Sequence, residues 1–179
     1  FTNQIIDIDY DHIPFQTVVQ QAESKLSRID IETRGKRIAY VMGAGDEIPA
    51  SLRQIGYQVD MVDANGLSSN TLKTYDALIL GVRAYNTLDA LKFKQSEIIK
   101  YVAEGGTVIV QYNTANGLVT KDLGPYPMTL SRNRVCVEEA EVRFLSPQHE
   151  ILNSPNKITA KDFEGWVQER GLYFPEEWD

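Results

Sequence analysis

The chain contains a single cysteine, Cys136, among its 179 residues. One cysteine excludes an internal disulfide and a cysteine-rich zinc site, but it does not settle the compartment, since many secreted domains contain no disulfide. Histidine is also scarce, because only His12 and His149 occur and neither has a partner at metal-ligand spacing. We therefore predict two structural histidines, no bound metal or cofactor, and a buried, unreactive Cys136 between Val135 and Val137.

Long apolar runs are absent, and none approaches the ~20 residues that a membrane-spanning helix requires. Basic residues are outnumbered, with 18 Lys and Arg against 25 Asp and Glu and a formal charge of −7. Such a surface repels phosphate backbones and anionic lipid, which argues against nucleic acid and membrane partners. The chain also lacks an initiator methionine and a signal peptide, so we expect it to be part of a longer polypeptide.

The residues present predict an α/β domain with a mostly parallel sheet. Buried-type strands are expected at residues 37–42, 58–62, 77–80 and 107–111, and helices after residue 46 and at 96–104. Alternation of strands and helices at this spacing favours a parallel sheet with helices on both faces. We therefore expect a three-layer, flavodoxin-like domain over residues 35–179, with a leader or linker arm over residues 1–34.

The two ends of the chain give weaker patterns. In the leader, Ile5, Ile6 and Ile8 suggest a strand, and residues 18–26 could form a short helix or an extended arm. Toward the other end, short strands are expected near residues 134–137 and 141–145. A capping box formed by Thr159 and Asp162 is expected to open a helix that runs through Trp166 to Arg170 and ends at Gly171.

Polar side chains follow the third and fourth predicted strands. Because parallel strands end at the same edge of a sheet, we expect Arg83, Asn86, Asn113 and Thr114 to converge on one concave site there. An arginine with amides can hold the hydroxyls or carboxylate of a ligand, although these side chains could instead only tie the loops together. Other candidates for the site or its wall are Trp166, Tyr173, Asp46, His149, Glu169 and Arg170.

The turn Gly43-Ala-Gly-Asp46 follows the first strand, where a phosphate-binding loop would lie. The third glycine of a dinucleotide fingerprint is missing because position 48 is isoleucine. Asp46 also places a carboxylate where a phosphate would sit. A tight turn is therefore the preferred interpretation, with Asp46 capping the next helix and Pro49 accommodated in its first turn.

Six short strings of the sequence share a resemblance: YDHIP (10–14), GAGD (43–46), GVRAYN (81–86), VQYNT (110–114), PYP (125–127) and, most specifically, DFEGWVQERGLYF (162–174). Together they resemble the carboxyl-terminal module of large bacterial PIG-L (LmbE-like) de-N-acetylases. The resemblance covers nearly the whole chain. It implies a fold similar to class I glutamine amidotransferases and the trehalose-utilisation protein group. It also implies a parent polypeptide exported by Bacteroidetes-type bacteria, whose deacetylase domain would be this module's partner.

Two departures from these families bear on catalysis. The amidotransferase cysteine would follow the strand at residues 108–110, where this chain has Gln111-Tyr-Asn113, and the deacetylase zinc motif is absent. We therefore expect a non-catalytic accessory module that packs against the deacetylase or holds glycan at the strand ends. Two alternatives stay open: a hydrolase that uses His149, Glu150 or Asp46, and a nucleotide or flavin binder at residues 43–46.

Overall fold

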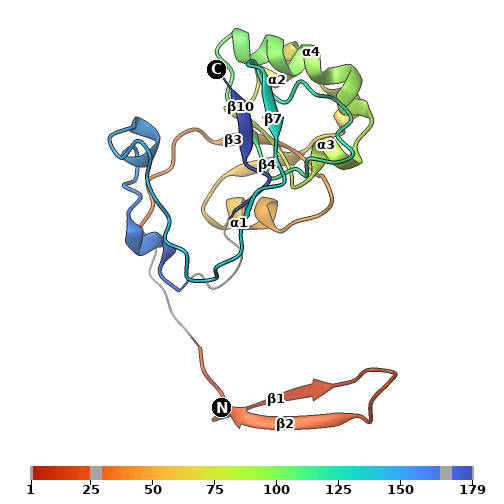
Figure 1. Ribbon diagram of the computed structural model, residues 1–179, viewed down its shortest axis with the longest axis vertical. Coiled ribbons are helices and arrows are strands. Elements are labelled where there is room, and N and C mark those ends of the chain that lie inside the picture. Colours follow the sequence, from red (N-terminus) through yellow and green to blue (C-terminus); the bar gives the residue numbers. More distant parts are fainter. Residues whose placement is uncertain (1, 25–29, 166–170, 179) are drawn as a thin grey trace. The chain divides into compact units, whose positions relative to one another are not determined.

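The computed structural model of this chain describes residues 2–24, 30–165 and 171–178. The chain divides into two compact units, Phe1–Asp30 and Ile31–Asp179. The first unit contains an antiparallel hairpin of β1 (Asn3–Ile8) and β2 (Gln16–Gln21) (Figure 1). The predicted first strand is confirmed, and the part of residues 18–26 that belongs to β2 is extended rather than helical. Residues 25–29 lie outside the described residues.

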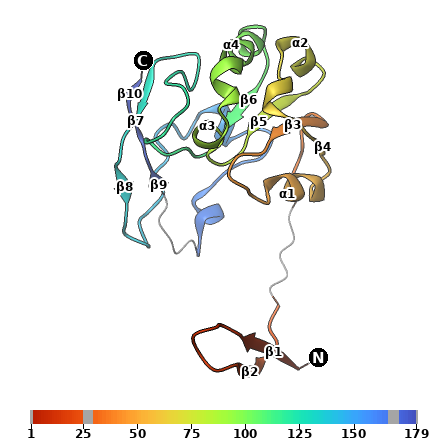
Figure 2. The ribbon, with the colours of Figure 1, turned by 90° about the vertical axis from the view of Figure 1, so that its right-hand side faces the viewer.

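The second unit is built on a parallel sheet of β3 (Arg37–Val41), β4 (Gln58–Met61), β5 (Ala77–Leu80) and β6 (Val108–Val110). The strand order is β4-β3-β5-β6, and all three neighbouring pairs are parallel (Figure 2). The prediction of four adjacent parallel strands is therefore confirmed. The central strands β3 and β5 are apolar almost throughout because both of their faces are covered.

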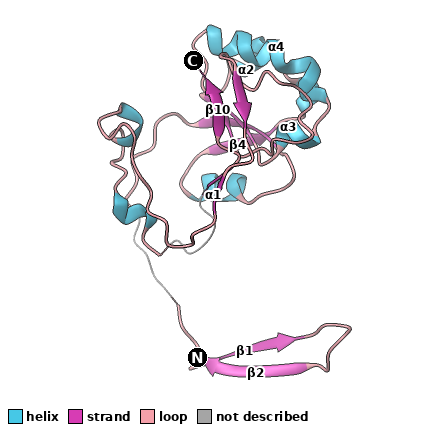
Figure 3. Ribbon diagram, viewed as in Figure 1, coloured by secondary structure: helices cyan, strands magenta, loops and turns pink. Residues whose placement is uncertain are grey.

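The helices that connect the strands of this sheet are α1 (Ile48–Gln54), η1 (Ala64–Gly66), α2 (Ser69–Leu72), α3 (Ala84–Thr87) and α4 (Ala90–Ala103) (Figure 3). The helix predicted at residues 96–104 is the second half of α4. The helix starts earlier because Leu91, Gln95 and Ile98 form one buried face at helical spacing. Within the described ranges, no helix has the length and apolar character needed to cross a membrane.

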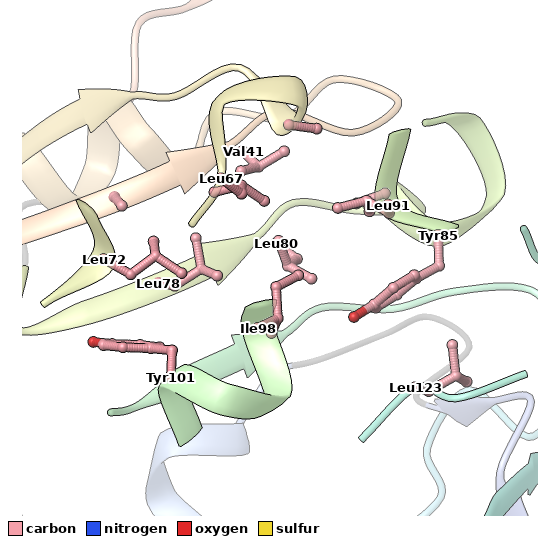
Figure 4. Packing of buried hydrophobic residues seen from close by; sticks show 13 residues of the cluster. Val41, Leu67, Leu72, Leu78, Leu80, Tyr85, Leu91, Ile98, Tyr101 and Leu123 are labelled. Atoms are coloured by element: carbon pink, nitrogen blue, oxygen red, sulfur yellow. The ribbon is translucent and has the colours of Figure 1, made fainter. Parts of the chain in front are cut away.

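Apolar side chains pack against both faces of the sheet. On one face, Leu78 and Leu80 of β5 meet Leu72 of α2 and Ile98 and Tyr101 of α4 (Figure 4). On the other face, a smaller cluster includes residues of β3, β4 and β5, and Leu52 of α1 packs against it. The protein thus has a mixed α/β fold around a four-stranded parallel sheet, as the sequence predicted at the level of fold class.

The remainder of the chain forms short elements rather than a continuation of the sheet. Antiparallel pairs join β7 (Met128–Leu130) to β10 (Pro175–Trp178) and β8 (Arg134–Val135) to β9 (Gly171–Leu172), and the 3₁₀ turns are η2 (Glu150–Leu152) and η3 (Ala160–Phe163). The strand predicted at residues 141–145 is wrong, because this segment has no regular structure. The capping box of Thr159 and Asp162 is confirmed, but it opens η3, and Gly171 belongs to β9.

The prediction of a buried Cys136 is also wrong, because this side chain is exposed. Strand β8 ends at Val135, so the alternating apolar pattern of residues 135–137 does not continue on a sheet face. Val137 is exposed as well. The pattern is typical of a buried strand, but no residue of the described ranges buries this segment.

A test of the sheet follows from the close approach of the loops after β3 and β5. A Cβ atom at Gly43 would lie 2.1 Å from the Val82 carbonyl oxygen and 2.8 Å from the Ala84 nitrogen. We expect Gly43→Ala to lower the free energy of unfolding by about 2 kcal/mol or more, because backbone atoms must move apart. Gly66→Ala is the control, since a Cβ there meets no atom within 4 Å. Equal urea-unfolding midpoints for the two variants would contradict this packing.

Candidate functional site at the carboxyl edge of the sheet

The loops that follow β5 and β6 are joined to each other by hydrogen bonds. The Arg83 amide donates to the Tyr112 carbonyl at 2.6 Å, and the Tyr85 amide donates to Asn113 Oδ1 at 3.0 Å. Asn86 and Thr114 exchange two hydrogen bonds, of 2.9 and 3.1 Å. The structure therefore brings together the two loops that the sequence predicted to converge.

The two asparagines, however, use their side chains within these loops. Asn113 is buried, and its Nδ2 donates to the Gln111 carbonyl at 2.7 Å while its Oδ1 accepts from Tyr85. Asn86 Nδ2 reaches the carbonyls of both Thr114 and Asn116, and the Thr114 hydroxyl donates to the Asn116 carbonyl. These three side chains tie the loops together, which is the second of the two roles that the sequence left open.

Arg83 differs from the other three predicted residues. Its backbone is left-handed, with φ 57° and ψ 26°, and it lies between β5 and the first residue of α3. A non-glycine residue with a left-handed backbone between a strand and a helix is strained, and such strain often occurs at ligand sites. Here the turn carries an arginine whose side chain is exposed and forms no hydrogen bond or ion pair with any described residue. The guanidinium is therefore available to a ligand.

An aromatic pair lies beside this turn. The rings of Tyr112 and Tyr173 have centroids 5.9 Å apart and are tilted by 51°. Tyr173 is the second non-glycine residue with a positive φ in the described part of the chain, at 52°. Both rings border a cavity of about 210 Å³, which is otherwise lined by Val110, Gln111, Asn113, Leu123, Met128, Leu130 and Leu172. A cavity of this size and character admits one small, largely apolar group.

A buried hydrogen-bond network lies beneath the same edge. Tyr40 donates its hydroxyl proton to Asp46 Oδ1 at 2.6 Å and accepts a hydrogen bond from Gln111 Nε2 at 2.7 Å. Burial, together with the hydrogen bond to Asp46, raises the pKa of the Tyr40 phenol. Tyr40 is not among the site residues predicted from the sequence, although a tyrosine within an apolar strand requires a partner for its hydroxyl.

Asp46 occupies the place where the winding of the sheet reverses. The connection after β3 leads to β4 on one side, and the connection after β5 leads to β6 on the other, so a crevice is expected between them. In this crevice Asp46 accepts hydrogen bonds from the amides of Ile48, at 3.0 Å, and Val82, at 3.3 Å. Asp46 thus binds the first amide of α1, but the N-cap residue is Glu47, so Asp46 does not hold the cap position that was predicted for it. Its carboxylate occupies amide donors that a phosphate would need.

The remaining candidates do not join this edge within the described residues. His149 Nδ1 accepts the Ile151 amide at the start of η2, and Glu150 lies 4.0 Å from Arg34, which precedes β3 at the opposite edge of the sheet. Trp166, Glu169 and Arg170 lie outside the described residues. Across the described ranges, no three His, Cys, Asp or Glu side chains gather as a metal-binding group.

The raised pKa of Tyr40 predicts a loss of stability at alkaline pH. Above pH ~10 the unfolded phenol loses its proton while the folded one keeps it, so the free energy of unfolding falls as pH rises. Each such group contributes a slope of up to about 1.4 kcal/mol per pH unit. We expect Tyr40→Phe to reduce this slope between pH 10 and 11.5, measured by urea unfolding, although it lowers stability at pH 7 by about 1–2 kcal/mol. Parallel pH curves for both proteins would contradict the network.

Comparison of the chain with protein-family models, with curated proteins and with solved structures gave no match in any of the three.

Proposed function

We propose that this protein is a non-catalytic, amidotransferase-like module that binds an amino-sugar glycan at the carboxyl edge of its sheet. In this proposal it serves a larger, exported PIG-L-like de-N-acetylase, and the deacetylase domain is its partner in the same polypeptide. The observation that carries the proposal is the guanidinium of Arg83 on a strand-to-helix turn. This group is exposed and has no hydrogen-bond or ion-pair partner among the described residues.

The sheet supports the fold in this proposal. The four parallel strands follow one another along the chain as β3, β4, β5 and β6. Across the sheet they lie in the order β4-β3-β5-β6, so the second strand of the chain lies outside the first, which is order 2-1-3-4. Doubly wound flavodoxin-like sheets begin with this same order. The candidate site also lies where such sheets bind ligands, outside the carboxyl ends of the strands.

The chemistry at this edge supports binding of a hydroxylated ligand. A guanidinium donates several hydrogen bonds in a fixed plane, which suits the hydroxyl and carbonyl oxygens of a sugar. The Arg83 amide binds the carbonyl of Tyr112, whose ring packs with that of Tyr173, and the small cavity that both rings border could accept the methyl of an acetamido group. Arg83 and Tyr173 also have strained backbones, and such strain is typical of ligand sites.

The local structure favours binding over catalysis. The loop after β6 has buried Asn113 where an amidotransferase nucleophile would be expected, and its side chain is satisfied by two backbone groups. Tyr40 and Asp46 form a hydrogen-bonded acid–base pair at this edge, but Tyr40 is fully buried. Substrate therefore cannot reach its hydroxyl without rearrangement of the loops.

Packing against another domain is a second proposed role for this module. Ile109 of the edge strand β6 is 49% exposed, whereas its neighbour Ile79 on β5 is 5% exposed. Ile48 and Ile55, which lie at the two ends of α1, are also exposed. Covering such side chains would contribute about 25 cal/mol per Å² of apolar surface removed from water.

The glycan proposal is tested by calorimetric titration with N-acetylglucosamine tetramer. We expect Arg83→Gly to weaken binding by about 1.5–3 kcal/mol, the worth of hydrogen bonds from a charged group. The same substitution should raise the free energy of unfolding by up to about 1 kcal/mol, because glycine adopts the left-handed conformation without strain.

The control is Arg143→Gln, which removes an exposed guanidinium from the irregular segment at residues 141–145. This variant should bind the tetramer like the wild type. Absence of wild-type binding up to millimolar concentration would reject the glycan and favour the packing role. Equal losses in both arginine variants would show a general charge effect rather than a site at Arg83.

A further inference from the structure

A second and larger concavity lies away from the carboxyl-edge site, between α4 and the loop at residues 120–127. Its volume is about 740 Å³, within the range of sites that hold small ligands. One wall is a single face of α4, formed by Lys92, Gln95, Ser96, Ile99, Lys100 and Ala103. The opposite wall contains Tyr126 between Pro125 and Pro127, and the Tyr126 ring is 69% exposed. We call this concavity the α4 groove.

The α4 groove is basic although the protein as a whole is acidic. Lys92, Lys100 and Lys121 border it, against the single carboxylate of Asp122, whereas the whole chain has a formal charge of −7. None of the three ammonium groups forms a hydrogen bond or ion pair with a described residue, although Lys100 helps to lower the pKa of Glu97 on its own helix. Positive charge is thus concentrated where the protein has an open recess.

Gln95 provides an independent indication of a ligand. This side chain borders the groove, is only 7% exposed, and its Oε1 accepts the hydroxyl proton of buried Tyr85 at 2.6 Å. Its Nε2 is buried and has no hydrogen-bond acceptor among the described residues. A buried donor without a partner destabilises the protein, so an acceptor that enters beside Gln95 would relieve this cost.

The positions of the lysines constrain the size of the ligand. Lys92 and Lys100 are eight residues apart on α4, which corresponds to ~12 Å along a helix axis. Both side chains would have to bend toward each other to share one phosphate or carboxylate. An extended ligand with several anionic groups can contact each lysine separately, and its sugar rings would also use the exposed face of Tyr126. A helix wall offers no unpaired backbone edge to which a peptide strand could add, so a saccharide fits this groove better than an acidic peptide.

We infer that the α4 groove binds an acidic oligosaccharide, with carboxylate or sulfate groups at the lysines and a sugar ring on Tyr126. This site is separate from Arg83 and does not depend on the function proposed above. It concerns a charged class of glycan, whereas the carboxyl-edge site is proposed to bind a neutral one.

The test is calorimetric titration of the whole chain with tetragalacturonate at 50 mM salt. Lys92→Gln and Lys100→Gln should each weaken binding about 2- to 5-fold, as expected for exposed charge pairs, and Tyr126→Ala about 2- to 10-fold. Lys94→Gln is the matched control, because it makes the same charge change on the same helix but lies outside the groove. It should leave the affinity unchanged.

Three outcomes would overturn the inference. One is the absence of wild-type binding to tetragalacturonate up to millimolar concentration. Another is a Lys94→Gln effect as large as that of Lys92→Gln, which would show attraction by net charge alone. The third is equally tight binding of a tetraglutamate peptide, because the groove would then recognise acidic peptides or charge rather than sugar. Tighter binding of tetragalacturonate than of tetraglutamate and of neutral N-acetylglucosamine tetramer supports it.

Discussion

The carboxylate of Asp46 is the constraint on which the carboxyl edge of the sheet depends. It binds the amide of Ile48 at the start of α1, the amide of Val82 after β5 and the hydroxyl of Tyr40 on β3. Through Tyr40 it also reaches Gln111 after β6. One side chain therefore links three neighbouring strands and a helix. Hydrogen bonds to a charged group are worth about 1.5–3 kcal/mol each, so this link is strong on the scale of a domain's stability.

The same link explains the conformation of Arg83. On one side of the loop after β5, the Val82 carbonyl accepts the Ala44 amide, and on the other the Arg83 amide donates to Tyr112. With both flanks fixed, the backbone at residue 83 has little freedom and adopts a left-handed conformation that costs about 1–2 kcal/mol for a side chain other than glycine. The surrounding hydrogen bonds offset the free-energy cost of this strained conformation. The arginine side chain is directed away from the packed loops to solvent.

The sequence predicted the parallel sheet well, because the segments that form β3 and β5 are apolar runs bounded by turns, and both are buried. It predicted less of the site. The convergence of the loops that carry Arg83 and Asn113 followed from strand direction. Which of these side chains forms hydrogen bonds within the loops, and which stays free for a ligand, depends on atomic positions that a sequence pattern does not give. The error at Cys136 has a related cause, since alternation at residues 135–137 indicates a strand only where a second layer covers it. The helix predicted through Trp166 to Arg170 falls on residues outside the described ranges.

The two loops of the carboxyl-edge site follow strands that differ in burial. β5 is central and its residues are almost fully buried, whereas β6 is an edge strand with exposed Ile109 and Val110. Local opening costs less free energy where burial is small, so β6 and the loop that carries Tyr112 should open more often than the turn that carries Arg83. A ligand that binds both loops would therefore stabilise mainly β6 and the loop that carries Tyr112. Occupancy of the site would be reported by slower amide hydrogen exchange in β6, while exchange in β5 stays nearly constant.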